Sequence, residues 1–190
     1  MKQNIKSFEK KIKINFKNKD LLIKSLTHKS SNKNYNNEKL EFLGDRVIGL
    51  IISKKLLSLY PNEQEGIIDK KFANLVNKKT CTLIAKKINL KKYIFLGTSH
   101  KKLDRSADKI SSDCLEAIIG AVYLDSGLKY AEKLILRFWE EHIHNSTITL
   151  IDSKSKLQEY SLKKFKELKK YIFSKKTGPQ HRPMFKTEVQ

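Results

Sequence analysis

The sequence has little cysteine, proline or glycine and contains no long apolar run. Its 190 residues include two cysteines, three prolines and seven glycines. Cys81 and Cys114 lie far apart and form no CxxC pair, so we expect no disulfide framework and a reducing cytoplasm as the compartment. No segment approaches the roughly 18 apolar residues that cross a bilayer, and the N-terminus has no apolar signal region. These absences predict a cytoplasmic protein with no membrane partner.

Acidic residues are also scarce relative to basic ones. Forty Lys and Arg residues stand against twenty Asp and Glu residues, which gives a formal net charge of +20. Such a field attracts polyanions and favours contact with phosphate backbones. A nucleic acid is therefore the first partner to consider. A ribosome or membrane surface, or a simple compositional bias toward lysine, is the alternative explanation of the charge.

Most of the chain has helical periodicity, so the predicted fold class is mainly α. The apolar spacing predicts helices over 4–14, 38–60, 67–88, 111–124 and 128–144, and a short helix with Asp20 as its N-cap. The polar stretch 30–37 is expected to be a loop. Beyond a helical body over 1–147 we expect a linker over 148–152 and then a basic α-β-β tail over 153–190. The tail has a helix over 153–164 and β-like runs over 171–175 and 184–190.

The placement of the few carboxylates is the most informative pattern. Glu38, Glu41 and Asp45 occur at i, i+3 and i+7, which places them within about 60° of one another on one helix face. Asp113 and Glu116 repeat the i, i+3 spacing among apolar residues of a second helix. The sequence thus predicts two acidic helix faces in largely buried surroundings.

Crowded, half-buried carboxylates must protonate or bind a cation. From the helix register, neither Lys39 nor Arg46 is expected to neutralise the group. Mg²⁺, with Mn²⁺ as a possible substitute, fits sparse carboxylates supplemented by water and substrate phosphate. The alternative is a solvated acidic face or a helix-dipole contact, and it is strongest for Glu38 taken alone. In a basic protein, a bound metal suggests hydrolysis of phosphodiester bonds.

Several motifs in order resemble the ribonuclease III family over essentially the whole chain. The segment NNEKLEFLGDRVIGLIIS (36–53) is similar to the family signature, and THKS (27–30), EG (65–66) and SDCLEAIIGAVYLDSG (112–127) resemble its other blocks. The resemblance implies an all-helical endonuclease domain over 1–147 that forms a homodimer. It also implies Mg²⁺-dependent cleavage of double-stranded RNA to 5′-phosphate and 3′-hydroxyl ends, in the processing of ribosomal and messenger RNA precursors.

The resemblance also implies roles for individual residues. Glu41, Asp113 and Glu116 match the family's metal-binding carboxylates, and Asp45 and Glu116 match the residues named as catalytic. In physical terms, Glu116 would position the metal that activates water. Asp45 would orient water or a metal ligand, or assist proton transfer.

Other matched positions support this core set. Glu38 and Glu65 match further acidic positions of the same valley, and Phe42 matches an aromatic dimer contact, with an ordinary core residue as the alternative. One departure is His100 (or Ser99) in LGTSH, where the family usually has an acid. With this residue in place of the acid, we expect the protein to retain cleavage, with altered metal affinity or pH dependence.

The tail resembles the start of a double-stranded RNA-binding domain over 152–165 and 178–189. Gln158 and Glu159 match its minor-groove helix positions, and His181 matches a second minor-groove contact. The sequence ends at Gln190, after what would be the second strand, so the resemblance implies a truncated domain over 153–190. We expect one helix with two strands to be weakly ordered alone and to contribute mainly nonspecific charge.

Two other functions are compatible with parts of the sequence. A non-catalytic double-stranded-RNA-binding or ribosome-assembly protein could share the fold, although the intact acidic set argues against it. A di-metal oxidoreductase would need more than the single Glu141-x-x-His144 motif. No P-loop, GxGxxG or GxSxG motif is present, so we expect no small-molecule cofactor.

Overall fold

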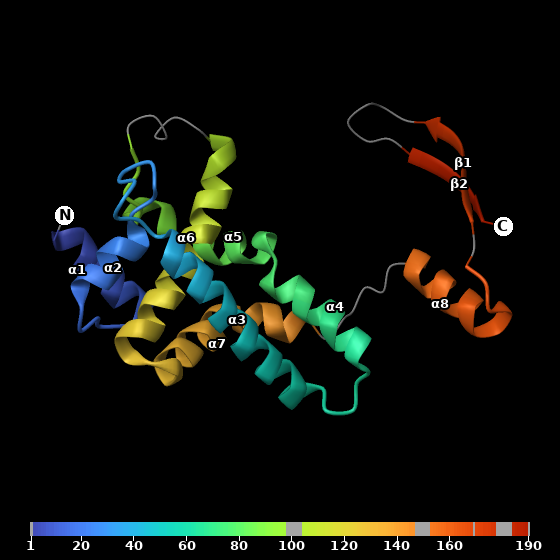
Figure 1. Ribbon diagram of the computed structural model, residues 1–190, viewed down its shortest axis with the longest axis horizontal. Coiled ribbons are helices and arrows are strands. Elements are labelled where there is room, and N and C mark those ends of the chain that lie inside the picture. The colour runs from blue at the N-terminus through green and yellow to red at the C-terminus, as the bar shows by residue number, and fades with distance from the viewer. Residues whose placement is uncertain (1, 98–103, 147–152, 169, 178–183, 190) are drawn as a thin grey trace. The chain divides into compact units, whose positions relative to one another are not determined.

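A computed structural model gives the arrangement of the chain (Figure 1) and describes residues 2–97, 104–146, 153–168, 170–177 and 184–189. The chain divides into two compact units, Met1–Thr149 and Leu150–Gln190. Helices dominate the first unit, which confirms the prediction of a mainly α fold. The second unit contains one helix and a two-stranded antiparallel hairpin. Each unit is described by itself below.

The helices and strands follow one another with short connections. In the first unit they are α1 (Lys2–Ile12), α2 (Lys19–Leu26), α3 (Glu38–Leu59), α4 (Glu65–Val76), α5 (Lys78–Lys87), the 3₁₀ helix η1 (Leu90–Tyr93), α6 (Asp104–Ser126) and α7 (Leu128–Asn145). In the second unit they are α8 (Ser153–Phe165), β1 (Tyr171–Thr177) and β2 (Met184–Val189). Over the ranges that the structure describes, no helix is long and apolar enough to cross a membrane.

Two local predictions are wrong. The expected helix over 67–88 is two helices, because Asn77 ends α4 and its side chain accepts a hydrogen bond from the Thr80 N–H at 2.9 Å. An asparagine that caps a new helix competes with continuation of the old one. The N-cap of α2 is Asn18, which accepts from the Asp20 N–H, and Asp20 instead accepts a hydrogen bond from the Tyr35 hydroxyl.

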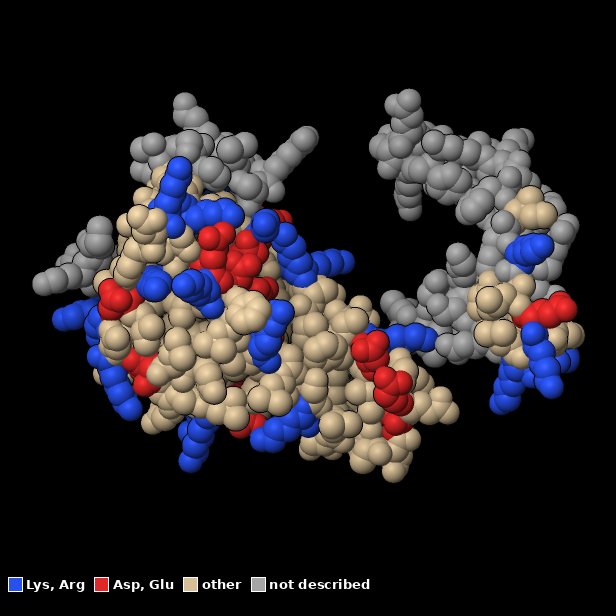
Figure 2. All heavy atoms as spheres, in the orientation of Figure 1, with Lys and Arg blue, Asp and Glu red and all other residues tan. Residues whose placement is uncertain are grey.

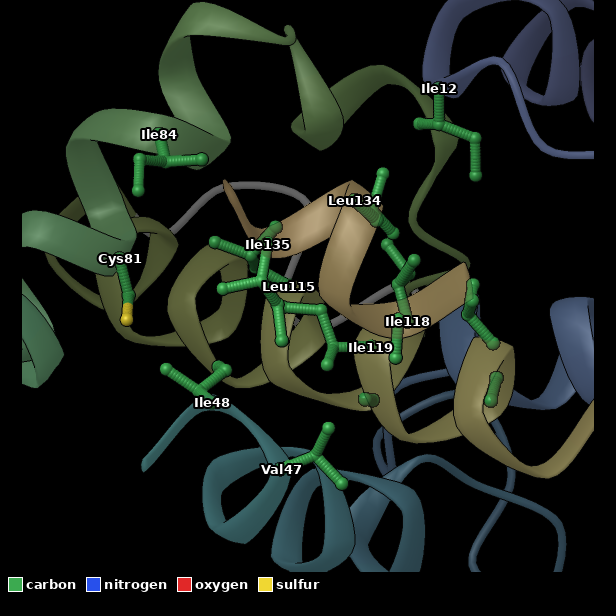
Figure 3. Close-up of a cluster of buried hydrophobic side chains, with 14 of the residues drawn as sticks. Ile12, Val47, Ile48, Cys81, Ile84, Leu115, Ile118, Ile119, Leu134 and Ile135 are labelled. Atoms are coloured by element: carbon green, nitrogen blue, oxygen red, sulfur yellow. The ribbon is translucent and has the colours of Figure 1, made fainter. Parts of the chain in front are cut away.

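The core of the first unit forms around α6. Leu115, Ile118 and Ile119 of this helix are fully buried and face the cluster drawn in Figure 3. Trp139 of α7 is also fully buried, and its indole N–H donates to the Leu75 carbonyl at 2.8 Å. Burial of apolar side chains of this size is the main stabilising contribution to such a fold.

Helices α3 and α6 touch through their backbones. A Cβ atom added at Gly44 would lie 1.8 Å from the Glu116 carbonyl oxygen, and one added at Gly120 would lie 2.2 Å from the Leu40 carbonyl oxygen. Only glycine permits this approach. The crossing lies between the acidic segment of α3 and the acidic segment of α6, so it determines how close the two sets of carboxylates come.

Candidate active site

The acidic residues of α3 and α6 meet beside the glycine crossing. A hollow of about 280 Å³ is lined by Glu38, Glu41, Phe42, Asp45, Arg46 and Glu116. Asp113 does not line the hollow, but its charge raises the pKa of Glu41. Figure 2 shows carboxylates gathered on the helical unit with Lys and Arg side chains around them. The structure therefore brings Glu41, Asp45, Asp113 and Glu116 together.

Burial and mutual repulsion perturb these carboxyl groups. Burial first, and then the charges of Asp45 and Asp113, raise the pKa of Glu116 to about 7. Burial and the charge of Asp113 also raise the pKa of Glu41, and burial raises that of Asp113. Raised carboxyl pKa values mean that the ionised cluster is unfavourable without a cation. They are also typical of functional sites.

Two members of the acidic group have cationic partners. The Lys29 ammonium lies 2.8 Å from the Glu38 carboxylate, and this hydrogen bond lowers the pKa of Glu38. Arg46 lies 2.5 Å from the Asp45 carboxylate. The group as a whole is not neutralised, but the expectation that Arg46 projects away from the neighbouring acids is wrong for Asp45. Lys29 comes from another segment of the chain, and the long Arg46 side chain folds back along the helix, so helix register alone could not predict either pair.

The remaining three acids are less compensated. Lys109 approaches Asp113 one helical turn away, but the distance is 4.0 Å. Among the residues described here, Glu41 and Glu116 form no ion pair. These two carboxylates come from different helices and are both half-buried. Their charges are therefore the least compensated of the acidic group.

The loop that carries Lys29 is fixed by backbone pairing with a distant segment. The His28 N–H donates to the Phe95 carbonyl at 3.1 Å, and the Gly97 N–H donates to the Ser30 hydroxyl at 3.1 Å. The Ser30 N–H donates to Nδ1 of the buried His28 at 3.2 Å. The THKS motif thus has a structural function, which is to hold Lys29 against the acidic group.

Two neutral residues beside Glu116 were not found from the sequence. The Ser112 hydroxyl lies 3.3 Å from Glu116 Oε1, and the pKa of the buried Cys81 thiol responds to both Ser112 and Glu116, so the thiol lies near them. Burial, followed by the charge of Glu116, raises the pKa of Cys81 to about 12, so the thiol keeps its proton. The i, i+4 spacing of Ser112 and Glu116 was the available signal for the first contact.

Phe42 and Glu65 lie at the surface. The Phe42 ring is 63% exposed, with the Arg46 guanidinium 4.4 Å from its centroid. The interpretation of Phe42 as a core residue is therefore wrong, and α3 is not buried on this side. Glu65 begins α4, is exposed and does not line the hollow in the single chain. Its role remains a prediction.

The structure describes only some of the expected RNA-binding residues. Gln158 lies on α8 and is half-buried. The side chain of Glu159, and both His181 and His100, lie outside the described residues. The RNA-binding assignments and the departure at His100 therefore remain predictions.

The site fits a hard divalent cation by the chemistry of its donors. All of its available ligands are carboxylate oxygens, which Mg²⁺ prefers. In the part of the chain that the structure describes, no three Asp, Glu, His or Cys side chains lie close enough together to hold a metal ion by themselves. An open set of carboxylates suits Mg²⁺, which keeps several waters and binds substrate phosphate. Glu141, the other candidate ligand, is exposed and pairs with Lys87 at 2.7 Å.

The fold and the site define a class of protein, a helical domain with a centre of half-buried carboxylates. A family model described as Ribonuclease-III-like matches residues 18–143. The chain belongs to the ribonuclease III family of endonucleases. Ribonuclease 3 of Pelagibacter ubique is 58% identical over 190 residues, which is all of this chain and 86% of that protein. Ribonuclease 3 of Aliarcobacter butzleri is 41% identical over 184 residues, covering 95% of this chain and 82% of that protein.

Solved structures agree with this assignment. The nuclease domain of ribonuclease III from Campylobacter jejuni, in a structure that concerns a region involved in dimer formation, is 40% identical with a TM-score of 0.69. The match covers 72% of this chain and 96% of that one. Dicer from Pichia stipitis, at 18% identity and a TM-score of 0.56 over 91% of this chain and 81% of that one, shares the fold.

Proposed function

We propose that the protein is a Mg²⁺-dependent endoribonuclease that hydrolyses phosphodiester bonds in double-stranded RNA. The products would carry 5′-phosphate and 3′-hydroxyl ends, and ribosomal and messenger RNA precursors in the cytoplasm are the proposed substrates. One observation carries the proposal. Glu41 and Glu116, from two helices, converge half-buried without an ion pair among the described residues, in a chain of net charge +20.

The acidic residues would have different roles in this reaction. Glu41, Asp113 and Glu116 would hold the metal, and Mn²⁺ would substitute for Mg²⁺. When bound, the metal supplies a nucleophile at neutral pH and stabilises the developing charge on the leaving oxygen. Asp45, which lines the hollow, would orient the attacking water or assist proton transfer. Glu38 is held by Lys29 and would shape the edge of the hollow.

Basic residues would bind the RNA backbone. Residues 151–190 hold eleven basic and four acidic residues, a denser positive charge than in the first unit. Proteins recognise double-stranded RNA through its shape, its minor-groove hydroxyls and its phosphates. We assign this RNA binding to residues 153–190, with Gln158, Glu159 and His181 as the proposed minor-groove contacts.

We also propose a homodimer formed through the exposed side of α3. Phe42 is 63% exposed there, and Leu50 and Leu57 are 57% and 60% exposed. Apolar side chains of this size in one exposed region indicate a protein interface. Light scattering should show a dimer for the natural chain and a monomer for Phe42→Glu. Leu83→Glu, at a 47% exposed leucine of α5, is the matched control and should remain dimeric. A Phe42→Glu protein that remains dimeric would contradict this interface.

A cleavage assay tests the nuclease proposal. Long duplex RNA is incubated with the full chain and Mg²⁺, and the same reaction is run with Ca²⁺ or with Glu116→Gln. Glu140→Gln, at an exposed acid of α7, is the matched control for loss of one carboxylate. We expect discrete cleavage by the natural chain and by Glu140→Gln, and none with Ca²⁺ or Glu116→Gln.

The same assay separates the alternative function. Tight binding of duplex RNA without cleavage at any Mg²⁺ concentration would favour a non-catalytic RNA-binding or ribosome-assembly protein. Binding should be measured at several salt concentrations, because phosphate contacts weaken steeply with salt.

A further inference from the structure

Two buried polar side chains meet at Glu116 and have no role in the proposed chemistry. Ser112 and Cys81 are each 1% exposed. Ser112 precedes Glu116 by four residues on α6, and its hydroxyl lies 3.3 Å from Glu116 Oε1. Cys81 comes from α5, and the charge of Glu116 raises the pKa of its buried thiol, so the thiol lies near this carboxylate. Donors from two helices therefore approach one carboxylate.

The position of Cys81 is at a boundary between two environments. Figure 3 shows it projecting from α5 into the apolar cluster that contains Ile48, Ile84 and Leu115. An aliphatic side chain would fill such a position equally well. The charge of Glu116 raises the pKa of this thiol, so the thiol lies near that carboxylate, and it carries a proton that an aliphatic group could not donate.

We propose that Ser112 and Cys81 are positioning residues for Glu116. Their O–H and S–H groups would hold one side of the carboxylate, so that its other lone pairs remain available to the hollow that Glu116 lines. The inference rests on the proposed function and deepens it. Groups that orient a metal ligand typically change metal affinity or activity by 10- to 100-fold when they are removed. Neither residue contacts substrate in this account.

Four variants of the full chain test the inference. Ser112→Ala removes the hydroxyl, Cys81→Val removes the thiol and keeps an apolar side chain, and Cys81→Ser keeps a donor. Ser111→Ala is the matched control, because Ser111 is a buried serine of the same helix that lines a different hollow. Two quantities are measured: the Mg²⁺ concentration that gives half of the maximal thermal stabilisation, and the single-turnover cleavage rate at saturating Mg²⁺.

We expect Ser112→Ala to raise the half-saturating Mg²⁺ concentration and to lower the single-turnover rate, each by about tenfold. Cys81→Val should act in the same direction, and Cys81→Ser and Ser111→Ala should resemble the natural chain. Unfolding in denaturant without metal separates these effects from loss of folding. If Ser112→Ala does not fold, the comparison of Cys81→Val with Cys81→Ser tests whether a donor at Glu116 is required.

The outcomes also separate this inference from the proposed function. A natural chain that does not cleave duplex RNA overturns the proposed function itself. A natural chain that cleaves, with Ser112→Ala and Cys81→Val matching Ser111→Ala in both measurements, overturns the positioning role alone. Equal effects of Cys81→Val and Cys81→Ser would reduce Cys81 to a packing residue and contradict its donor role.

Discussion

Replacing Glu116 by glutamine should stabilise the metal-free protein at alkaline pH. In the folded chain, burial and the charges of neighbouring acids raise the pKa of this group from 4.5 to about 7. Such a difference corresponds to about 3 kcal/mol for one titrating group. Partial solvent exposure reduces this to about 2 kcal/mol. Glutamine removes the unfavourable charge and keeps the shape of the side chain.

The pH dependence follows from proton uptake. Because the folded-state pKa is the higher one, the folded protein binds more protons than the unfolded chain between pH 4.5 and about 7. The stability of the metal-free natural chain should therefore fall as pH rises through this range and level off above it. Glu116→Gln should match the natural chain near pH 4.5 and exceed it at pH 8, with a melting temperature about 6 °C higher.

Thermal unfolding with EDTA, at both pH values, measures this difference. Glu140→Gln, at the exposed acid of α7, should change neither the melting temperature nor its pH dependence. Added Mg²⁺ should reverse the order at pH 8, since a ligand stabilises only the protein that binds it. A Glu116→Gln protein that is no more stable than the natural chain at pH 8 without metal would refute the reasoning about this cluster.

Three other substitutions test the framework of the site by denaturant unfolding. Gly44→Ala should cost about 3 kcal/mol, because the new Cβ would lie 1.8 Å from an α6 carbonyl oxygen, whereas Gly66→Ala, with nothing within 4 Å, should cost nothing. Lys71→Met should cost about 2 kcal/mol, because Lys71 is 3% exposed and its ammonium donates to the Ser146 carbonyl at 2.8 Å. Asn77→Ala should cost about 1 kcal/mol, because it removes the cap of α5. Equal stability of Gly44→Ala and Gly66→Ala would contradict the close helix crossing.

The helices that carry the site were predictable because their signals are local. The long apolar period before Pro61 predicts α3 to within a residue or two, and the spacing of its acids places them on one face. The break at Asn77 was not predictable from periodicity, because asparagine is compatible with a helix and also caps one. Only the hydrogen bond from the Thr80 N–H to Asn77 shows that the helix breaks here and a new one begins.

The sequence could not predict which acids have cationic partners, because these contacts depend on tertiary structure. The sequence indicates that carboxylates of two helices share a pocket, but the Lys29 contact with Glu38 requires the loop pairing that the fold provides. Cys81 and Ser112 escaped notice for a different reason. Small neutral residues in a helix carry no charge pattern, so their relation to Glu116 becomes visible only when α5 and α6 are packed together.

Binding of Mn²⁺, followed by electron paramagnetic resonance, tests the central claim most directly. The natural chain should bind Mn²⁺ saturably, and Mg²⁺ should compete for the same site. A variant with both Glu41→Gln and Glu116→Gln should stay folded and lose this binding, because it lacks the two carboxylates that have no ion pair among the described residues. Equal Mn²⁺ binding by the two proteins would contradict the claim that these acids converge to hold a catalytic metal.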